Sequence, residues 1–166
     1  MAARANPRRG SEPERRMGDD MRFEESIGID WPVEEDFAYV SEADNFPEWT
    51  GTAIEVRKRA PGPVREGDTF TVVVKFLGRW VETPYERTSY EPNNQRFTER
   101  AAGGPAPNQP WTNTFQEVPG GTRLTRAVEG EPGGFFKLAD PLIKRALKRQ
   151  VRADLETLKD LPEARR

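Results

Sequence analysis

The chain has 166 residues, with 26 lysines and arginines against 28 acidic residues, a net charge of −2, and neither cysteine nor histidine. This composition excludes disulfides, cysteine nucleophiles and histidine ligands, and it disfavours a globally basic nucleic-acid binder. No segment approaches the ~20 apolar residues of a membrane span, and the N-terminus lacks the apolar stretch of a signal peptide. We therefore expect a cytoplasmic protein with no metal, no other cofactor, no nucleic-acid partner and no stable membrane insertion.

Residues 1–20 are predicted to form a disordered tail. They mix arginines with acidic residues, proline and glycine, and they hold too few apolar side chains to offset the entropy of ordering. Met17 and Met21 are alternative translation starts to Met1. The other interpretation of the segment is a basic arm for an anionic partner.

Order is expected from Met21 onward. Phe23, Ile27 and Ile29 share one parity, which indicates a first strand with one buried face. After Asp30-Trp31-Pro32, apolar residues recur at helical spacing over 33–40 and predict a short helix. Ser41 is expected to cap a second short helix that stops near Pro47.

The middle of the chain is strand-like. Turn residues divide it into six expected strands, around residues 54–56 and over 69–77, 79–91, 96–101, 111–118 and 122–129. The Gly/Pro-rich stretch 103–110 is predicted to be a loop. Phe46 and Trp49, just before the first of these strands, are interpreted as a plug that packs the short helices against the sheet.

The end of the chain changes to a helical period. The apolar stripe steps by three or four residues through Leu142, Ala146, Leu147, Val151, Leu155 and Leu158. Asp140 and Pro141 are suited to the cap and the first helical residue, and Pro162 to the stop. A start near Phe135, with Pro141 as a kink, is the alternative.

This order predicts an α+β fold, a curved seven-stranded antiparallel sheet wrapped around a long C-terminal helix, with two short helices after the first strand. A sheet with one apolar face must cover that face, and only the long helix carries enough apolar surface to do so. A strongly curved sheet closed over a helix leaves room for an apolar small molecule.

Three motifs and their order carry a family resemblance. They are the strand, proline and helix opening at 27–40, the Asp44-Asn45-Phe46-Pro47-Glu48-Trp49 segment, and the glycine-glycine-threonine hairpin at 120–125; the Leu155–Leu161 stretch is similar to the family's usual helix ending. The region 21–161 thus resembles the START/polyketide cyclase-like superfamily, also called SRPBCC or Bet v 1-like, with 162–166 as a short tail. The resemblance implies a helix-grip fold with a hydrophobic pocket. It does not imply one activity, because relatives include lipid carriers, hormone receptors and aromatic polyketide cyclases.

Charged and aromatic residues at strand centres are the site candidates. A buried charge must be paired, placed at the pocket mouth or bound to a polar ligand group. Inward Glu and Arg side chains are therefore interpreted either as groups that strand twist and pocket water leave solvated, or as a set that orients a carboxylate or enol. The candidates for ligand binding are Tyr85, Arg87, Phe97, Glu99, Trp111, Phe115, Arg126, Phe135, Leu142 and Leu147. Candidates for catalysis are Glu25, Tyr85 and Arg87.

Three functions follow from these expectations. The first is a carrier or sequestering protein for a lipid or an aromatic, polyketide-type metabolite. The second is a polyketide cyclase/dehydratase that acts by positioning its substrate, with help from a carboxylate, tyrosine or arginine. The third is a protein-interaction module that uses the basic face of the C-terminal helix, formed by Lys144, Arg145, Lys148, Arg149 and Arg152.

Overall fold

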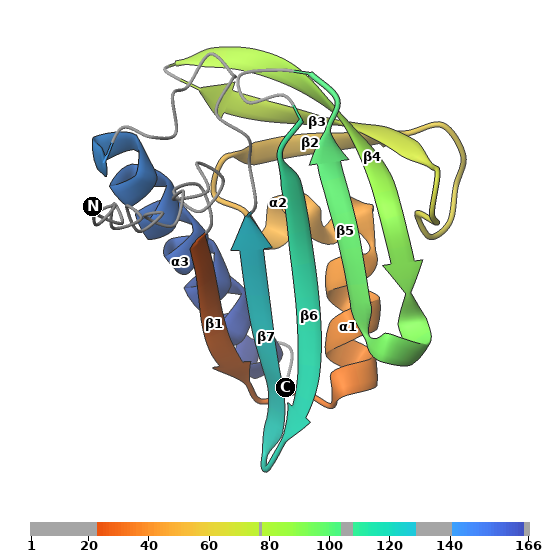
Figure 1. Ribbon diagram of the computed structural model, residues 1–166, viewed down its shortest axis with the longest axis vertical. Helices are drawn as coiled ribbons and strands as arrows, with labels where there is room; N and C mark the ends of the chain where they lie inside the picture. Colours follow the sequence, from red (N-terminus) through yellow and green to blue (C-terminus); the bar gives the residue numbers. More distant parts are fainter. Residues whose placement is uncertain (1–22, 77, 104–107, 129–140, 165–166) are drawn as a thin grey trace, which may run out of the picture.

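A computed structural model describes residues 23–76, 78–103, 108–128 and 141–164. Seven antiparallel strands form one sheet in the order β1-β7-β6-β5-β4-β3-β2 (Figure 1). The strands are β1 (Phe23–Ile29), β2 (Ala53–Lys58), β3 (Thr69–Phe76), β4 (Arg79–Glu91), β5 (Arg96–Ala101), β6 (Pro110–Val118) and β7 (Gly121–Val128). The predicted number of strands and their order along the chain are confirmed.

The first and last strands of the chain pair with each other. β1 is first in sequence and pairs with the last strand, so Ile29 lies opposite Thr122. Gly121 makes this approach possible, because a Cβ there would lie 2.1 Å from the Ile29 carbonyl oxygen. Thr122 then donates a hydrogen bond from its hydroxyl to the Trp31 carbonyl at 2.8 Å, which fixes the chain as it leaves β1.

An irregularity in β4 decides which side chains face the interior. The pairing of β4 with β5 shifts between Arg87 and Ser89, so that Arg87 faces Glu99 while Tyr90 faces Phe97. A bulge of this kind adds one residue and reverses the alternation of side chains beyond it. Tyr85, Arg87 and Tyr90 therefore all contribute to the inner face, although simple alternation would separate Arg87 from Tyr90.

Helices cover this inner face (Figure 1). They are α1 (Val33–Ser41), the 3₁₀ turn η2 (Ala43–Asn45), α2 (Phe46–Trp49) and α3 (Pro141–Ala164), and a further turn, η3 (Pro92–Asn94), joins β4 to β5. α3 packs against β1 and α2, and α1 packs against β6 and β7. The arrangement is the predicted helix-grip fold.

Three predicted helix boundaries differ from the structure. Ser41 ends α1 and bonds back to the Ala38 carbonyl, whereas the side chain of Glu42 caps the following turn through the Asp44 amide. Pro47 lies in the first turn of α2, where a proline needs no amide hydrogen, so the helix continues to Trp49. α3, described from Pro141 onward, runs through Pro162 to Ala164, because a proline in the last turn does not have to end a helix. The alternative start near Phe135 lies outside the described residues.

The main core lies between the sheet and the helices. Val151, Leu155 and Leu158 of α3 are at most 3% exposed and belong to one cluster with rings and aliphatic side chains of the sheet and α1. A second, smaller cluster gathers around Phe70 and Val72 where β2, β3 and β4 bend over the top of Figure 1. The predicted tail at 1–20 and the candidate Phe135 lie outside the described residues.

Candidate ligand-binding site

Charged and polar side chains form a row across the inner face of the sheet. Arg87 on β4 lies opposite Glu99 on β5, and Asn113 on β6 lies opposite Arg126 on β7. All four side chains are buried, with exposed fractions between 0% and 8%. We call Arg87, Glu99, Asn113 and Arg126 the inner polar row. Buried polar groups need partners, so their hydrogen bonds show which of them the protein itself satisfies.

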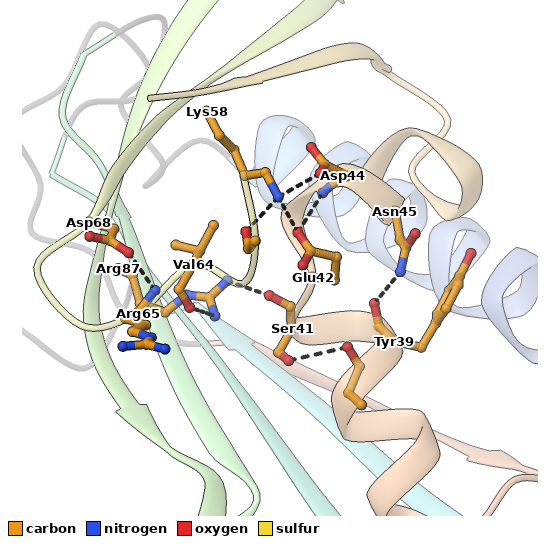
Figure 2. Close-up of polar contacts among 12 residues, drawn as sticks. Tyr39, Ser41, Glu42, Asp44, Asn45, Lys58, Val64, Arg65, Asp68 and Arg87 are labelled. Atoms are coloured by element: carbon orange, nitrogen blue, oxygen red, sulfur yellow. Dashed lines mark hydrogen bonds and ion pairs between the residues drawn. The ribbon is translucent and has the colours of Figure 1, made fainter. Parts of the chain in front are cut away.

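Arg87 is held by the protein. Its Nη2 donates to Glu99 Oε1 at 2.5 Å and to the Ser41 carbonyl at 2.9 Å, and its Nη1 donates to the Val64 carbonyl at 3.2 Å. Figure 2 shows the guanidinium between the two carbonyls, one at the end of α1 and one in the loop before β3. The cation also lies 4.4 Å from the centre of the Phe97 ring. These contacts tie three distant segments together, which is a structural role.

Next to this pair, Lys58 ties the start of the same loop to the short helices. Its Nζ lies 2.7 Å from Glu42 Oε1, 2.5 Å from Asp44 Oδ2 and 2.7 Å from the Gly62 carbonyl (Figure 2). The lysine side chain is 9% exposed, so this network is only partly open to water. Arg87 and Lys58 together hold the 59–68 loop against η2 and the end of α1.

Arg126 has different surroundings. Its guanidinium lies 4.6 Å from the centre of the Trp111 ring, 5.0 Å from that of Trp49 and 5.6 Å from that of Phe46. The Nε and Nη1 atoms are buried and have no hydrogen-bond partner. Burial lowers the pKa of Arg126, opposed by the nearby carboxylates of Asp154 and Glu99. The inner polar row thus contains one arginine whose two Nη atoms are bonded by the protein, with only Nε unpartnered, and one arginine that lacks partners for both Nε and Nη1.

Two further polar atoms near this arginine lack partners. Asn113, the register partner of Arg126, has an unpartnered side-chain oxygen, and Trp49 has an unpartnered indole nitrogen. Both side chains are 2% exposed. Each unsatisfied buried group costs roughly 1–3 kcal/mol, so several together make this part of the inner face a candidate site for polar ligand atoms.

Tyr85 lies on the same face at the edge of the smaller core cluster. Its ring stacks on Phe70, with centroids 5.7 Å apart. Burial raises the pKa of Tyr85 to about 12, so the phenol stays protonated at neutral pH. It can donate a hydrogen bond or a proton, but it is a poor base.

The remaining candidates lie at varied positions. Glu25 points toward α3 and forms an ion pair with Lys148 at 3.2 Å. Phe97 and Phe115 are buried in the main cluster, Trp111 and Leu147 pack against it, and Leu142 is 72% exposed. Of the basic helix face, Arg145, Lys148, Arg149 and Arg152 are exposed, and Arg152 pairs with Glu156. The ligand-binding and catalytic roles assigned to these residues stay predictions.

Three buried polar residues were missed by the sequence analysis. Asp154 lies in the apolar stripe of α3 and accepts hydrogen bonds from the Gly51 amide at 2.9 Å and from Gln150 at 2.8 Å. Asp36 lies in the stripe of α1, is 0% exposed, and has no partner for either carboxylate oxygen. Asn113 lies midway between Trp111 and Phe115 in one strand. Each is a polar residue at an apolar position of its period, a signal that helical or strand periodicity can detect.

The described residues also form two surface hollows. One, of about 340 Å³, is lined by residues 58–65 and 67–69, and one, of about 600 Å³, by residues 30–35, 117, 118, 120 and 121. The described residues contain no group of acidic side chains placed to hold a metal ion. No helix in the described part of the chain is long and apolar enough to cross a membrane.

The fold and the inner polar row can now be compared with known proteins. The family described as "Polyketide cyclase / dehydrase and lipid transport" matches residues 20–163. The chain belongs to this family. No curated protein matches the chain.

Solved structures agree with the family's fold. A START superfamily protein from Mycobacterium smegmatis has a TM-score of 0.71 at 14% identity, over 87% of this chain and 99% of the other. The Zhui aromatase/cyclase from a Streptomyces species has a TM-score of 0.69 at 12% identity, over 87% and 94%. The di-domain ARO/CYC BexL reaches 0.66 at 21% identity, over 86% of this chain and 46% of BexL. At these identities the likeness shows the fold alone.

Proposed function

We propose that this member of the polyketide cyclase/dehydrase and lipid transport family binds a small apolar molecule between the inner face of the sheet and α3, as a carrier or sequestering protein. The ligand class is a lipid or an aromatic, polyketide-type metabolite. The observation that carries the proposal is the combination of aromatic rings with unpartnered polar atoms on one buried face, at Trp49, Asn113 and Arg126. An apolar pocket with a few convergent polar groups is typical of a small-molecule site.

Aromatic probes provide a direct test on the full chain. A neutral naphthalene derivative at a hundred times its dissociation constant should stabilise the protein by about 2.7 kcal/mol, seen as a rise in thermal midpoint of about 5–10 °C. Trp111→Ala should weaken binding about tenfold or more, because it removes a ring from the inner face. Trp80→Ala is the matched control, since Trp80 is 67% exposed, and it should leave binding unchanged.

Native mass spectrometry of the purified chain supplies an independent reading. A co-purified lipid or aromatic compound would support the carrier role and identify the ligand. If no molecule co-purifies and neither fatty acids nor aromatic probes raise the thermal midpoint, the binding proposal is wrong. Equal losses of probe affinity in Trp111→Ala and Trp80→Ala would show that the ligand does not bind at the inner face.

A cyclase/dehydratase is the second candidate function. The family's description includes such enzymes, and the fold matches two solved proteins whose names identify them as aromatase/cyclases. On this chain the best-placed acid is Tyr85, which stays protonated at neutral pH on the inner face. It would donate its proton or a hydrogen bond to a developing enolate while the rings hold the substrate.

Turnover of a poly-β-keto substrate tests this second function. Tyr85→Phe keeps the ring that stacks on Phe70 and removes only the hydroxyl. It should lower kcat by about 10²-fold or more with little change in stability. Tyr39→Phe is the control, because the Tyr39 hydroxyl bonds to Glu48 in an exposed position. Unchanged turnover in Tyr85→Phe would remove Tyr85 as the acid, and no product from the wild type would leave only the carrier.

A further inference from the structure

The charge of Arg126 has no direct partner among the described residues. Three carboxylates that strand register or electrostatic attraction places near it are each engaged elsewhere. Glu25, its register partner on β1, pairs with Lys148 at 3.2 Å, and Glu99 bonds to Arg87 at 2.5 Å. Asp154 accepts from Gly51 and Gln150 and approaches Arg126 only as a longer-range charge.

Aromatic rings surround the buried guanidinium of Arg126. The side chain is 7% exposed, and Trp111, Trp49 and Phe46 lie within 5.6 Å of its centre. The rings attract the cation, but a ring face does not replace a hydrogen-bond acceptor for Nε and Nη1. A buried arginine with two free donors is costly, and nothing in its surroundings within the described residues satisfies them.

We propose that Arg126 binds an anionic oxygen of the ligand, a carboxylate or phenolate carried on a flat aromatic skeleton. The charge-assisted bonds from Nε and Nη1 would replace the hydration that Arg126 loses on burial. The indole rings beside it would contact the ligand's ring system, and the unpartnered amide oxygen of Asn113 lies on the next strand to accept a ligand hydroxyl. This inference rests on the proposed function and specifies which small molecules the site selects.

A matched pair of probes separates the proposal that the protein binds an aromatic molecule from the inference that Arg126 selects an anionic one. 2-Naphthoate and 2-ethylnaphthalene have the same ring system and similar size, but only the first carries a carboxylate. Calorimetric titration of the full chain should show 2-naphthoate binding about tenfold or more tightly, the usual advantage of a charged hydrogen bond. Arg126→Gln should remove that advantage and change the affinity for 2-ethylnaphthalene by less than about twofold. Arg152→Gln, which neutralises an exposed arginine of α3, should change neither.

The outcomes distinguish failure of the inference from failure of the function. If the wild type binds both probes equally, the protein binds aromatic molecules but Arg126 does not select an anion. If Arg126→Gln weakens both probes equally, Arg126 only shapes the site, and the inference is again wrong. If neither probe binds, the proposed function fails for aromatic ligands, and the inference fails with it.

Thermal unfolding without ligand gives a readout that does not depend on any probe. Arg126→Met keeps most of the side-chain volume and removes an unpartnered buried charge, so its thermal midpoint should rise above that of the wild type. A residue kept for ligand binding destabilises the free protein in this way. A clear fall in the midpoint of Arg126→Met would make Arg126 a structural residue and overturn the inference.

Discussion

Replacing Arg87 with methionine should lower the free energy of unfolding by about 3–5 kcal/mol, the usual cost of removing one partner of a buried ion pair. The guanidinium is completely buried and is bonded to Glu99, Ser41 and Val64. Methionine fills much of the volume but leaves the Glu99 carboxylate and two carbonyls without a donor. Urea denaturation followed by circular dichroism measures the loss.

The same two strands offer a matched control on the exposed face. Arg100 on β5 and Glu86 on β4 are register partners whose ion pair is 2.8 Å long, with side chains 45% and 35% exposed. Arg100→Met should cost less than about 1 kcal/mol, because water solvates the remaining carboxylate. Equal decreases in the free energy of unfolding for Arg87→Met and Arg100→Met would contradict the structural role of Arg87.

A double-mutant cycle tests whether Arg87→Met loses stability because it leaves the Glu99 carboxylate buried without a partner. In Arg87→Met combined with Glu99→Gln, the carboxylate that Arg87→Met leaves without its partner is removed as well, so the double variant should be more stable than Arg87→Met alone. If Arg87→Met instead kept its stability but lost probe binding or turnover, Arg87 would belong to the site, as the sequence analysis expected.

Asp36 should make the protein more stable in mild acid than at neutral pH. Burial raises the pKa of Asp36 from 3.8 to about 7, and neither carboxylate oxygen has a hydrogen-bond partner. Below pH 4 the folded and unfolded states are both protonated, and this group costs nothing. As the pH rises from 4 to 7, Asp36 releases its proton only in the unfolded chain. The free energy of unfolding therefore falls by up to about 4 kcal/mol.

The variant Asp36→Asn isolates this contribution. It has the same shape without a titrating group, so it should be more stable than the wild type at pH 8, with the difference shrinking toward pH 5. Urea denaturation across this range measures the difference. Asp154, whose pKa is also raised by burial, is present in both proteins and cancels from the comparison. Glu34→Gln, in the same turn but exposed, is the control. Parallel pH profiles for wild type and Asp36→Asn would show that Asp36 has another partner in solution.

The structure gives different contacts to two arginines that the sequence analysis had both named as ligand-binding candidates. They are Arg126 and Arg87, and Arg87 was also a candidate for catalysis. In the structure Arg87 joins α1, β5 and the loop before β3, whereas Arg126 keeps free donors among aromatic rings. Trp49, interpreted first as a plug that packs the short helices against the sheet, lies against the Arg126 guanidinium at 5.0 Å.

The sequence by itself determined the order of elements and the fold. Alternation over the strands and a three-to-four spacing from Leu147 to Leu158 are local properties of the chain, and they report which face of each element is buried. The same local pattern placed Arg126 on the parity of Leu124 and Val128, whereas an inward position of Arg87 and Glu99 depended on which face of the middle strands is buried.

Only the tertiary structure decided which buried charges have partners. The acceptors of Arg87 lie 46 and 23 residues away in sequence, at Ser41 and Val64, and nothing in the local pattern around either arginine predicts them. The shift in register after Arg87 likewise reverses the alternation that sequence reasoning relies on. Periodicity reports burial, but hydrogen bonding depends on how distant segments meet, and the difference between a structural and a ligand-binding arginine lies in those bonds.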